Sequence, residues 1–244
     1  MLPGYSAWIR ARIHNQNYGS ILIVKKPTNI PSQTHGLAIK QERGQLTHDR
    51  LIATGFRMLE LTDLQEISIA ELTREAGYSV GAFYSRFRSK DEFFDALIAK
   101  HLETRTRAQV YMFATLSTDV LVSEMIHNVV SYYWDHRKFW RAVLVRSVRD
   151  SDFWEPIRKH GHVFTGRFLE RATRELGRSL TEKEEANIIF AFQVTLGTIN
   201  STIINQPGPI FMGQKLYIEE LVRAFQLISD FENLVKAGAR KRKA

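Results

Sequence analysis

The chain has 244 residues, of which 44% are hydrophobic and 25% charged, the composition of an ordinary globular protein. It has no cysteine, which excludes disulfides and thiolate chemistry, and we expect a cytoplasmic protein. The formal net charge is +8, and the excess lies near the two ends: six basic residues face one acidic residue in 1–43, and five face none in 236–244. Net charge therefore does not identify the partner, and the argument must come from positions.

Residues 1–43 form a basic extension that we expect to be disordered. Pro3, Pro27 and Pro31 interrupt it, and glycine, serine, asparagine and glutamine are frequent. Three alternatives stay open: a segment that does not belong to the native protein, a basic arm that contacts a nucleic-acid backbone or minor groove, and a transit peptide. Residues 236–244 are a second basic tail.

An amphipathic helix is predicted from Leu46 onward. Leu51, Phe56 and Leu59 recur at helical spacing and define its apolar side. We expect it to end near Asp63, because aspartate tolerates a left-handed backbone.

Closely spaced start and stop signals follow. Ser68 and Glu71 have the spacing of a capping box, and Gly77 supplies a left-handed stop only a few residues later. Ser79 can then cap a second short helix, and Ser89 opens a longer one. This succession is typical of a helix-turn-helix unit.

The remaining chain is also predicted to be helical, and the whole fold all-α. A capping box at Thr181 opens an apolar helix, which ends before the Gln206-Pro207-Gly208-Pro209 loop. The expected helices are Thr118–Asp135, Lys138–Arg149, Asp152–Leu176, Thr181–Asn205 and Gly213–Val235.

The second helix of the helix-turn-helix carries the functional prediction. Such a helix inserts its first residues into the major groove of DNA, so they must be small or polar. The residues that meet this requirement are Ser79, Val80, Gly81 and Ala82. Phe83 and Phe87 are expected to face the core, and Tyr84, Ser85 and Arg86 to face outward. Arg88 and Lys90 add positive charge on the side where phosphates would lie.

The stretch from Ile67 to Glu92 resembles the N-terminal domain of TetR-type transcriptional regulators. The resemblance implies a three-helix DNA-binding domain over residues 44–104, followed by a helical domain for effector binding and dimerisation over 105–235. By position, it implies phosphate contacts from Ser68, Ser79, Gly81, Tyr84 and Lys90. It also implies that Val80, Ala82, Ser85 and Arg86 lie near bases. The chain departs from the family pattern at Asp63, Val80 and Ala82, where Gly, a basic residue and Thr are usual.

The resemblance further implies a homodimer formed through Thr181–Asn205 and Gly213–Val235. From Asn187 to Gln214 the sequence has no charged residue, which fits either a core helix or a subunit interface. Polar residues within the run argue against a membrane span. The resemblance also implies a pocket for a small, hydrophobic effector. Aromatic residues are dense between Tyr111 and Phe168, and they either line such a pocket or form ordinary core.

Catalysis and metal binding have no support in the sequence, and no cofactor is expected. His160-Gly161-His162 is interpreted as an exposed turn between helices rather than a metal site, because no further ligand lies at a suitable spacing. The sequence therefore predicts a repressor that a small effector releases from a double-stranded DNA operator. The alternative is a non-specific architectural DNA-binding protein that works through its basic tails.

Overall fold

The computed structural model describes residues 32–150 and 152–243, which form α-helices, one short 3-10 helix and no strand. The predicted all-α fold is confirmed. The helices are α2 (Ser32–Leu61), α3 (Ile69–Ala76), α4 (Val80–Tyr84), α5 (Lys90–Thr115), α6 (Thr118–Asp135), α7 (Arg137–Arg149), η1 (Asp152–Trp154), α8 (Glu155–Leu176), α9 (Glu182–Asn205), α10 (Lys215–Ser229) and α11 (Phe231–Lys243).

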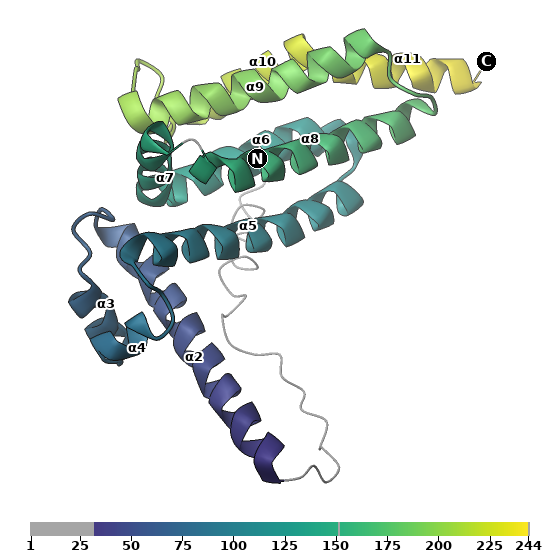
Figure 1. The fold of residues 1–244 in the computed structure, drawn as a ribbon. Helices are drawn as coiled ribbons and strands as arrows, with labels where there is room; N and C mark the ends of the chain where they lie inside the picture. Colours follow the sequence, from purple (N-terminus) through teal and green to yellow (C-terminus); the bar gives the residue numbers. More distant parts are fainter. Residues whose placement is uncertain (1–31, 151, 244) are drawn as a thin grey trace.

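Helices α2, α3 and α4, together with the start of α5, form a small N-terminal unit, here called the headpiece. It lies beside one end of the other helices, and α5 continues from it into the larger part of the molecule (Figure 1). Phe83 of α4 is fully buried and packs against Phe87 and Phe93, with ring centroids 5.3 and 5.6 Å apart. Burying aromatic side chains of this size is the main stabilising contribution to so small a unit.

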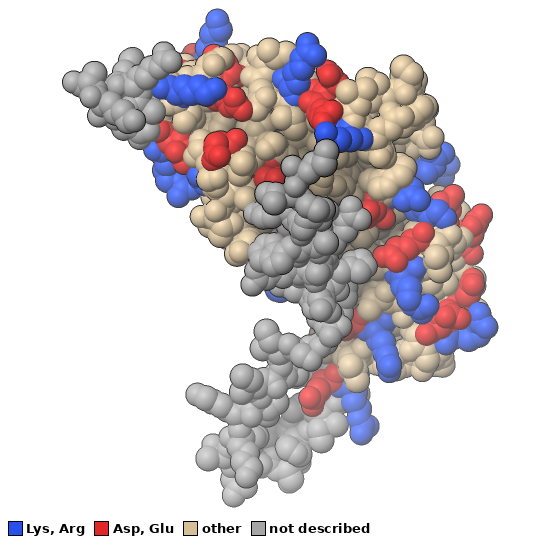
Figure 2. All heavy atoms as spheres, turned by 180° about the vertical axis from the view of Figure 1, so that it is seen from behind, with Lys and Arg blue, Asp and Glu red and all other residues tan. Residues whose placement is uncertain are grey.

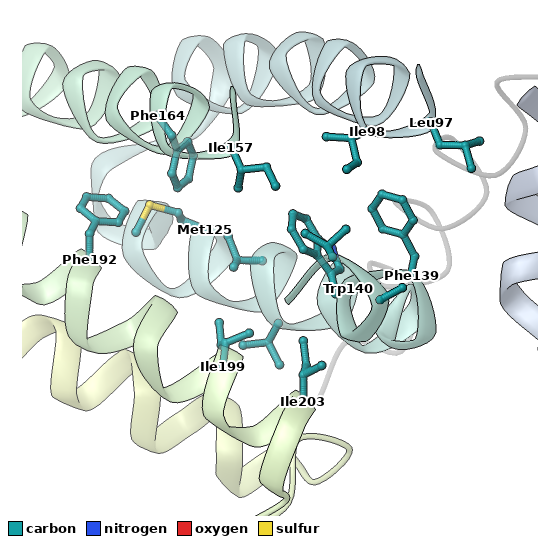
Figure 3. Packing of buried hydrophobic residues seen from close by; sticks show 14 of the residues in the cluster. Leu97, Ile98, Met125, Phe139, Trp140, Ile157, Phe164, Phe192, Ile199 and Ile203 are labelled. Atoms are coloured by element: carbon teal, nitrogen blue, oxygen red, sulfur yellow. The ribbon is translucent and has the colours of Figure 1, made fainter. Parts of the chain in front are cut away.

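The remaining helices stack in three layers, with α5 below α6 and α8, and with α9, α10 and α11 on the opposite side (Figure 1). Apolar side chains from each layer meet between them, as Figure 3 shows for Ile98 of α5, Met125 of α6, Phe164 of α8 and Phe192 of α9. Close packing of this kind fixes the layers relative to one another.

The first helix is longer than its sequence pattern predicts. It begins at Ser32, so residues 32–43 are helical, and the predicted boundary at residue 44 falls inside α2. The predicted disorder of residues 1–31 lies outside the described residues. Asp63 does not take the left-handed conformation expected of it; α2 ends at Leu61, and a turn joins the Glu66 N–H to the Asp63 carbonyl.

The C-terminal helix also differs from the prediction. The expected helix Gly213–Val235 is two helices, because Asp230 adopts a left-handed backbone with φ of 52° and ends α10. The predicted tail 236–244 continues as helix α11 up to Lys243. His160 and His162 lie within α8 and not in a turn between helices, so that expectation was wrong.

Candidate nucleic-acid interface

The turn between α3 and α4 is built by three local interactions. Ser68 caps α3 by accepting a hydrogen bond from the Glu71 N–H at 3.1 Å. Gly77 has a left-handed backbone with φ of 78°, which costs glycine little, and its N–H bonds to the last carbonyls of α3. Ser79 then caps α4 by accepting from the Ala82 N–H at 3.2 Å. The predicted helix boundaries in this unit are confirmed.

Helix α4 has one buried and one exposed side. Phe83 is 0% exposed, whereas Val80 and Tyr84 are 42% and 53% exposed. Ser79 and Gly81 are exposed as well. The front of the helix is therefore free to meet another surface, while the phenylalanine side holds it against the headpiece core.

The serine hydroxyls of the site have different capacities. Those of Ser68 and Ser79 accept hydrogen bonds from backbone N–H groups, so each keeps its own proton available for donation. The Ser85 hydroxyl donates to the Ala82 carbonyl at 2.7 Å, so in this conformation it can only accept from a further partner. Ser68 and Ser79 can thus donate to an anionic oxygen, and Ser85 cannot.

Arg86 lies against α2. A Cβ atom built on Gly44 would come within 2.6 Å of the Arg86 Nη2, so the guanidinium passes directly over that glycine. His48, one turn further along α2, packs on Phe87 with ring centroids 5.3 Å apart. Sequence reasoning missed Gly44 and His48 as parts of the site, because the pattern placed the domain boundary at residue 44.

Lys90 points toward the protein and not outward. Its Nζ donates to the Gln65 carbonyl at 3.2 Å, and it lines a shallow hollow beside Leu64, Ile67 and Ser68. Burial lowers the pKa of Lys90, partly offset by the neighbouring Asp91. The side chain must exchange the Gln65 carbonyl for another acceptor if it is to contact a phosphate.

The charges of the headpiece are mixed. Arg57 and Arg74 both pair with Glu75, whereas neither Arg86 nor Arg88 forms an ion pair with a carboxylate whose position is described. Basic and acidic side chains are interspersed on the face of the molecule that Figure 2 displays. Arg86 and Arg88, which follow α4 directly in the chain, are thus cations without a described carboxylate partner.

A second exposed surface lies on α9 and α10. The predicted capping box is present, with Thr181 and Glu184 each bonding to the other's backbone N–H. Phe190, Leu216 and Leu227 are 56%, 47% and 73% exposed. By length and composition α9 could cross a membrane, a test that core helices also pass, and 39% of its apolar window is buried.

Within residues 32–150 and 152–243, no group of three or more His, Cys, Asp or Glu is placed to hold a metal ion.

The comparisons with known proteins agree with this geometry. Residues 51–97 match the model of the family described as Bacterial regulatory proteins, tetR family. A curated relative, the Uncharacterized HTH-type transcriptional regulator YwcC of Bacillus subtilis (strain 168), is 29% identical over 114 residues. That match covers 41% of this chain and 50% of the relative, so the chain spans about half the length of the relative it matches.

Two solved structures match about three quarters of this chain. Salmonella enterica GusR has a TM-score of 0.56 at 13% sequence identity, covering 75% of this chain and 95% of that chain. A TetR transcriptional regulator from Rhodococcus sp. RHA1 has a TM-score of 0.47 at 16% identity, covering 77% and 97%. The likeness to GusR shows that the two proteins share a fold.

Proposed function

We propose that this chain, whose residues 51–97 match the tetR family of bacterial regulatory proteins, is a transcriptional repressor that binds a double-stranded DNA operator. The observation that carries the proposal is α4, which two buried phenylalanines hold from behind while its small-residue front stays exposed. We place the protein in the cytoplasm and assign it no enzymatic activity.

The proposed contacts divide into two kinds. Ser68, Ser79, Gly81, Tyr84 and Lys90 bind phosphates, and the free hydroxyl protons of Ser68 and Ser79 suit this role. Val80, Ala82, Ser85 and Arg86 lie near base edges. Val80 offers only an apolar contact, such as one with a thymine methyl, and Ser85 offers an acceptor.

The repressor acts as a homodimer, in our proposal, through α9 and α10. These helices form the outer layer of the molecule (Figure 1), and they keep Phe190, Leu216 and Leu227 in contact with solvent. A large exposed apolar area on a soluble domain marks an interaction surface. Two copies related by a two-fold axis would present two α4 helices to successive major grooves.

In our proposal, the effector releases the DNA by moving α7, which contacts both the headpiece and the layers behind it. Lys138 of α7 donates to the Leu61 carbonyl at the end of α2. Arg146, near the other end of α7, pairs with Asp95 of α5 at 3.1 Å. A small effector bound among α5 to α8 would shift α7 and, with it, the separation of the two headpieces.

The test is selection of bound duplexes from a random pool by the full chain. We expect a near-palindromic sequence with half-sites about one helical turn apart. The architectural alternative predicts no enriched sequence, and it predicts that replacing the Lys and Arg residues of 1–43 and 236–244 with Gln abolishes binding. A repressor of the proposed kind keeps its sequence preference after that replacement.

A further inference from the structure

Three polar side chains occupy the buried side of α5, one per turn. His101, Arg105 and Gln109 follow Leu97 and precede Phe113 at regular spacing of four residues, and all are less than 9% exposed. Burying polar groups at three successive core positions costs free energy unless each of them is hydrogen-bonded. The three polar residues are recognisable in the sequence, because they occupy the positions that continue the apolar side of α5 between Leu97 and Phe113.

Arg105 is a buried cation without a counter-charge. Its Nη2 donates to the Asn128 Oδ1 at 2.9 Å, and its guanidinium lies 3.9 Å from the centroid of the Tyr132 ring. Within the described part of the chain, no carboxylate pairs with it. Burial lowers the pKa of Arg105 to about 10, so it remains charged at neutral pH.

The groups around Arg105 bond to one another, and among the described residues they add no negative charge. Gln109 Nε2 is 3.1 Å from His160 Nε2, and Thr106 Oγ1 is 3.3 Å from His160 Nδ1. Because the Thr106 hydroxyl donates to the Leu102 carbonyl, it must accept from Nδ1–H, which leaves His160 Nε2 to accept from the Gln109 amide. His160 is thus neutral in this arrangement.

Two N–H donors close to these residues have no hydrogen-bond partner among the described residues, and neither has the Gln109 Oε1 acceptor. Arg167 Nη1 on α8 and Trp140 Nε1 on α7 are buried, and neither forms a hydrogen bond with a described residue. Arg167 lies two helical turns after His160 on the same side of α8, and the charges of Arg105 and Arg167, after burial, both lower the pKa of His160. An unpaired buried donor costs free energy that a ligand oxygen would recover.

We propose that Arg105, Trp140 and Arg167 form the anion-binding part of the effector site, beside the hydrogen-bonded pair Gln109–His160, and that its ligand is a small organic carboxylate bearing an apolar ring. The proposal rests on the proposed function, since it names the chemistry of that effector. A guanidinium matches a carboxylate in shape, and a singly charged anion is cheaper to bury than a phosphate dianion. The ligand is therefore amphipathic and not only hydrophobic.

Aromatic rings next to the cluster supply the apolar part of the site and a route to the headpiece. Tyr133 stacks on Trp140 with centroids 4.5 Å apart. His101 stacks on Phe139 at 4.7 Å, and Phe139 contacts Phe56 of α2 at 5.8 Å. A ring inserted beside Trp140 would displace this row of side chains, which ends on the first helix of the headpiece.

The experiment measures the melting temperature of the full chain with a panel of ring-bearing carboxylates, beginning with benzoate and phenylacetate, each paired with its neutral amide. Inorganic phosphate is added as a separate arm. We expect carboxylates of the panel to raise the melting temperature by about 5 °C near 100 times their Kd, and the amides to raise it much less. Equal shifts from each acid and its amide, no shift from any acid, or an equal shift from phosphate would overturn the proposal.

Variants show whether the cluster is the site. Arg105→Met and Arg167→Met should each reduce the carboxylate-induced shift at least threefold. Arg107→Met is the matched control, because Arg107 lies one residue beyond Thr106 on α5 but is exposed and pairs with Glu103. Arg105→Met removes an uncompensated buried charge, so without ligand it should melt no lower than the wild type. Carboxylate shifts that survive in both variants would contradict the assignment.

The failure of this proposal is distinguishable from failure of the proposed function. Arg107→Met should bind the selected operator as the wild type does and be released by the carboxylate, whereas Arg105→Met should no longer be released by it. Absence of any sequence-specific DNA binding in the wild type would overturn the repressor function, whereas the melting experiment would still report on the anion site.

Discussion

The guanidinium of Arg86 rests on the backbone of α2 at Gly44, where a Cβ atom would lie 2.6 Å from Nη2. A residue just beyond the end of α4 is thereby oriented by a glycine more than forty positions earlier. The packing leaves room for Arg86 only because residue 44 has no side chain.

Gly44→Ala should therefore displace Arg86 and weaken operator binding by about threefold to tenfold, as expected for loss of one oriented side chain at a base edge. The fold should persist, since only the far end of a flexible side chain must move and alanine favours helix. The measurement is operator affinity by fluorescence anisotropy. Gly166→Ala on α8 is the control, because nothing lies within 4 Å of its added Cβ. Unchanged operator affinity in Gly44→Ala would show that the position of Arg86 against α2 does not contribute to DNA binding.

Neighbouring residues on α4 should separate stability from binding. Phe83→Ala removes a fully buried ring and should lower the free energy of unfolding by about 3–5 kcal/mol. Tyr84→Ala should leave stability nearly unchanged and weaken operator binding. Chemical denaturation and anisotropy check the two effects. Tyr111→Ala, which removes an exposed tyrosine from α5, should change neither. A loss of stability in Tyr84→Ala equal to that in Phe83→Ala would refute the division of the two sides.

Arg86→Ala and Lys90→Ala should have different signatures. The first should reduce affinity for the operator more than for random DNA, relaxing preference at one position. The second should weaken binding to all sequences alike and reduce the slope of log affinity against log salt by about 1. Lys90 gives up its hydrogen bond to the Gln65 carbonyl when it binds a phosphate. The loss of affinity in Lys90→Ala should therefore be small for a phosphate contact. Identical, sequence-independent losses would contradict the assigned roles.

Stability should fall as the pH falls from about 6.5 toward 4. Burial, followed by Arg105 and Arg167, lowers the pKa of His160 to about 4, and burial, followed by His136 and Arg105, lowers that of His101. In this window the unfolded chain binds protons that the folded chain does not, so the free energy of unfolding decreases with falling pH. Melting temperatures of the wild type and His160→Gln check this. The variant should lose less stability between pH 7 and 5; an equal or greater loss would count against the lowered pKa.

The exposed apolar side chains of α9 and α10 should control the oligomeric state. Phe190→Arg and Leu227→Arg should each raise the dimer dissociation constant at least tenfold, because a charge placed in an apolar interface is poorly compensated. Analytical ultracentrifugation provides the measurement. Val148→Arg on α7 is the control, since Val148 is 87% exposed and lies outside the two helices. A wild type that sediments as a monomer would remove the basis of the dimer.

Local chemistry explains which elements could be predicted. Ser68, Gly77 and Ser79 bond to backbone groups within a few residues of themselves. The helix ends that they set can therefore be predicted from the neighbouring sequence. The same holds for the capping box at Thr181. The exposed front of α4 follows from these boundaries and from the spacing of Phe83 and Phe87.

Two kinds of feature were missed. Asp230 ends α10 with a left-handed backbone although it is not glycine, and the apolar periodicity runs through it unbroken. Contacts between helices were missed as well. His160 was considered only as a metal ligand or turn residue, because its contacts with Thr106 and Gln109 cross from α8 to α5. Arg86 over Gly44 is likewise a contact between helices that spacing along one helix does not reveal.

The most direct test of the central claim is photo-cross-linking of the full chain to its selected operator with 5-bromouracil in place of thymine, followed by identification of the attached residues. The account predicts attachment within Ser79–Arg86, above all at Tyr84 or Val80. Attachment confined to residues 1–43 or 236–244, with none on α4, would contradict it.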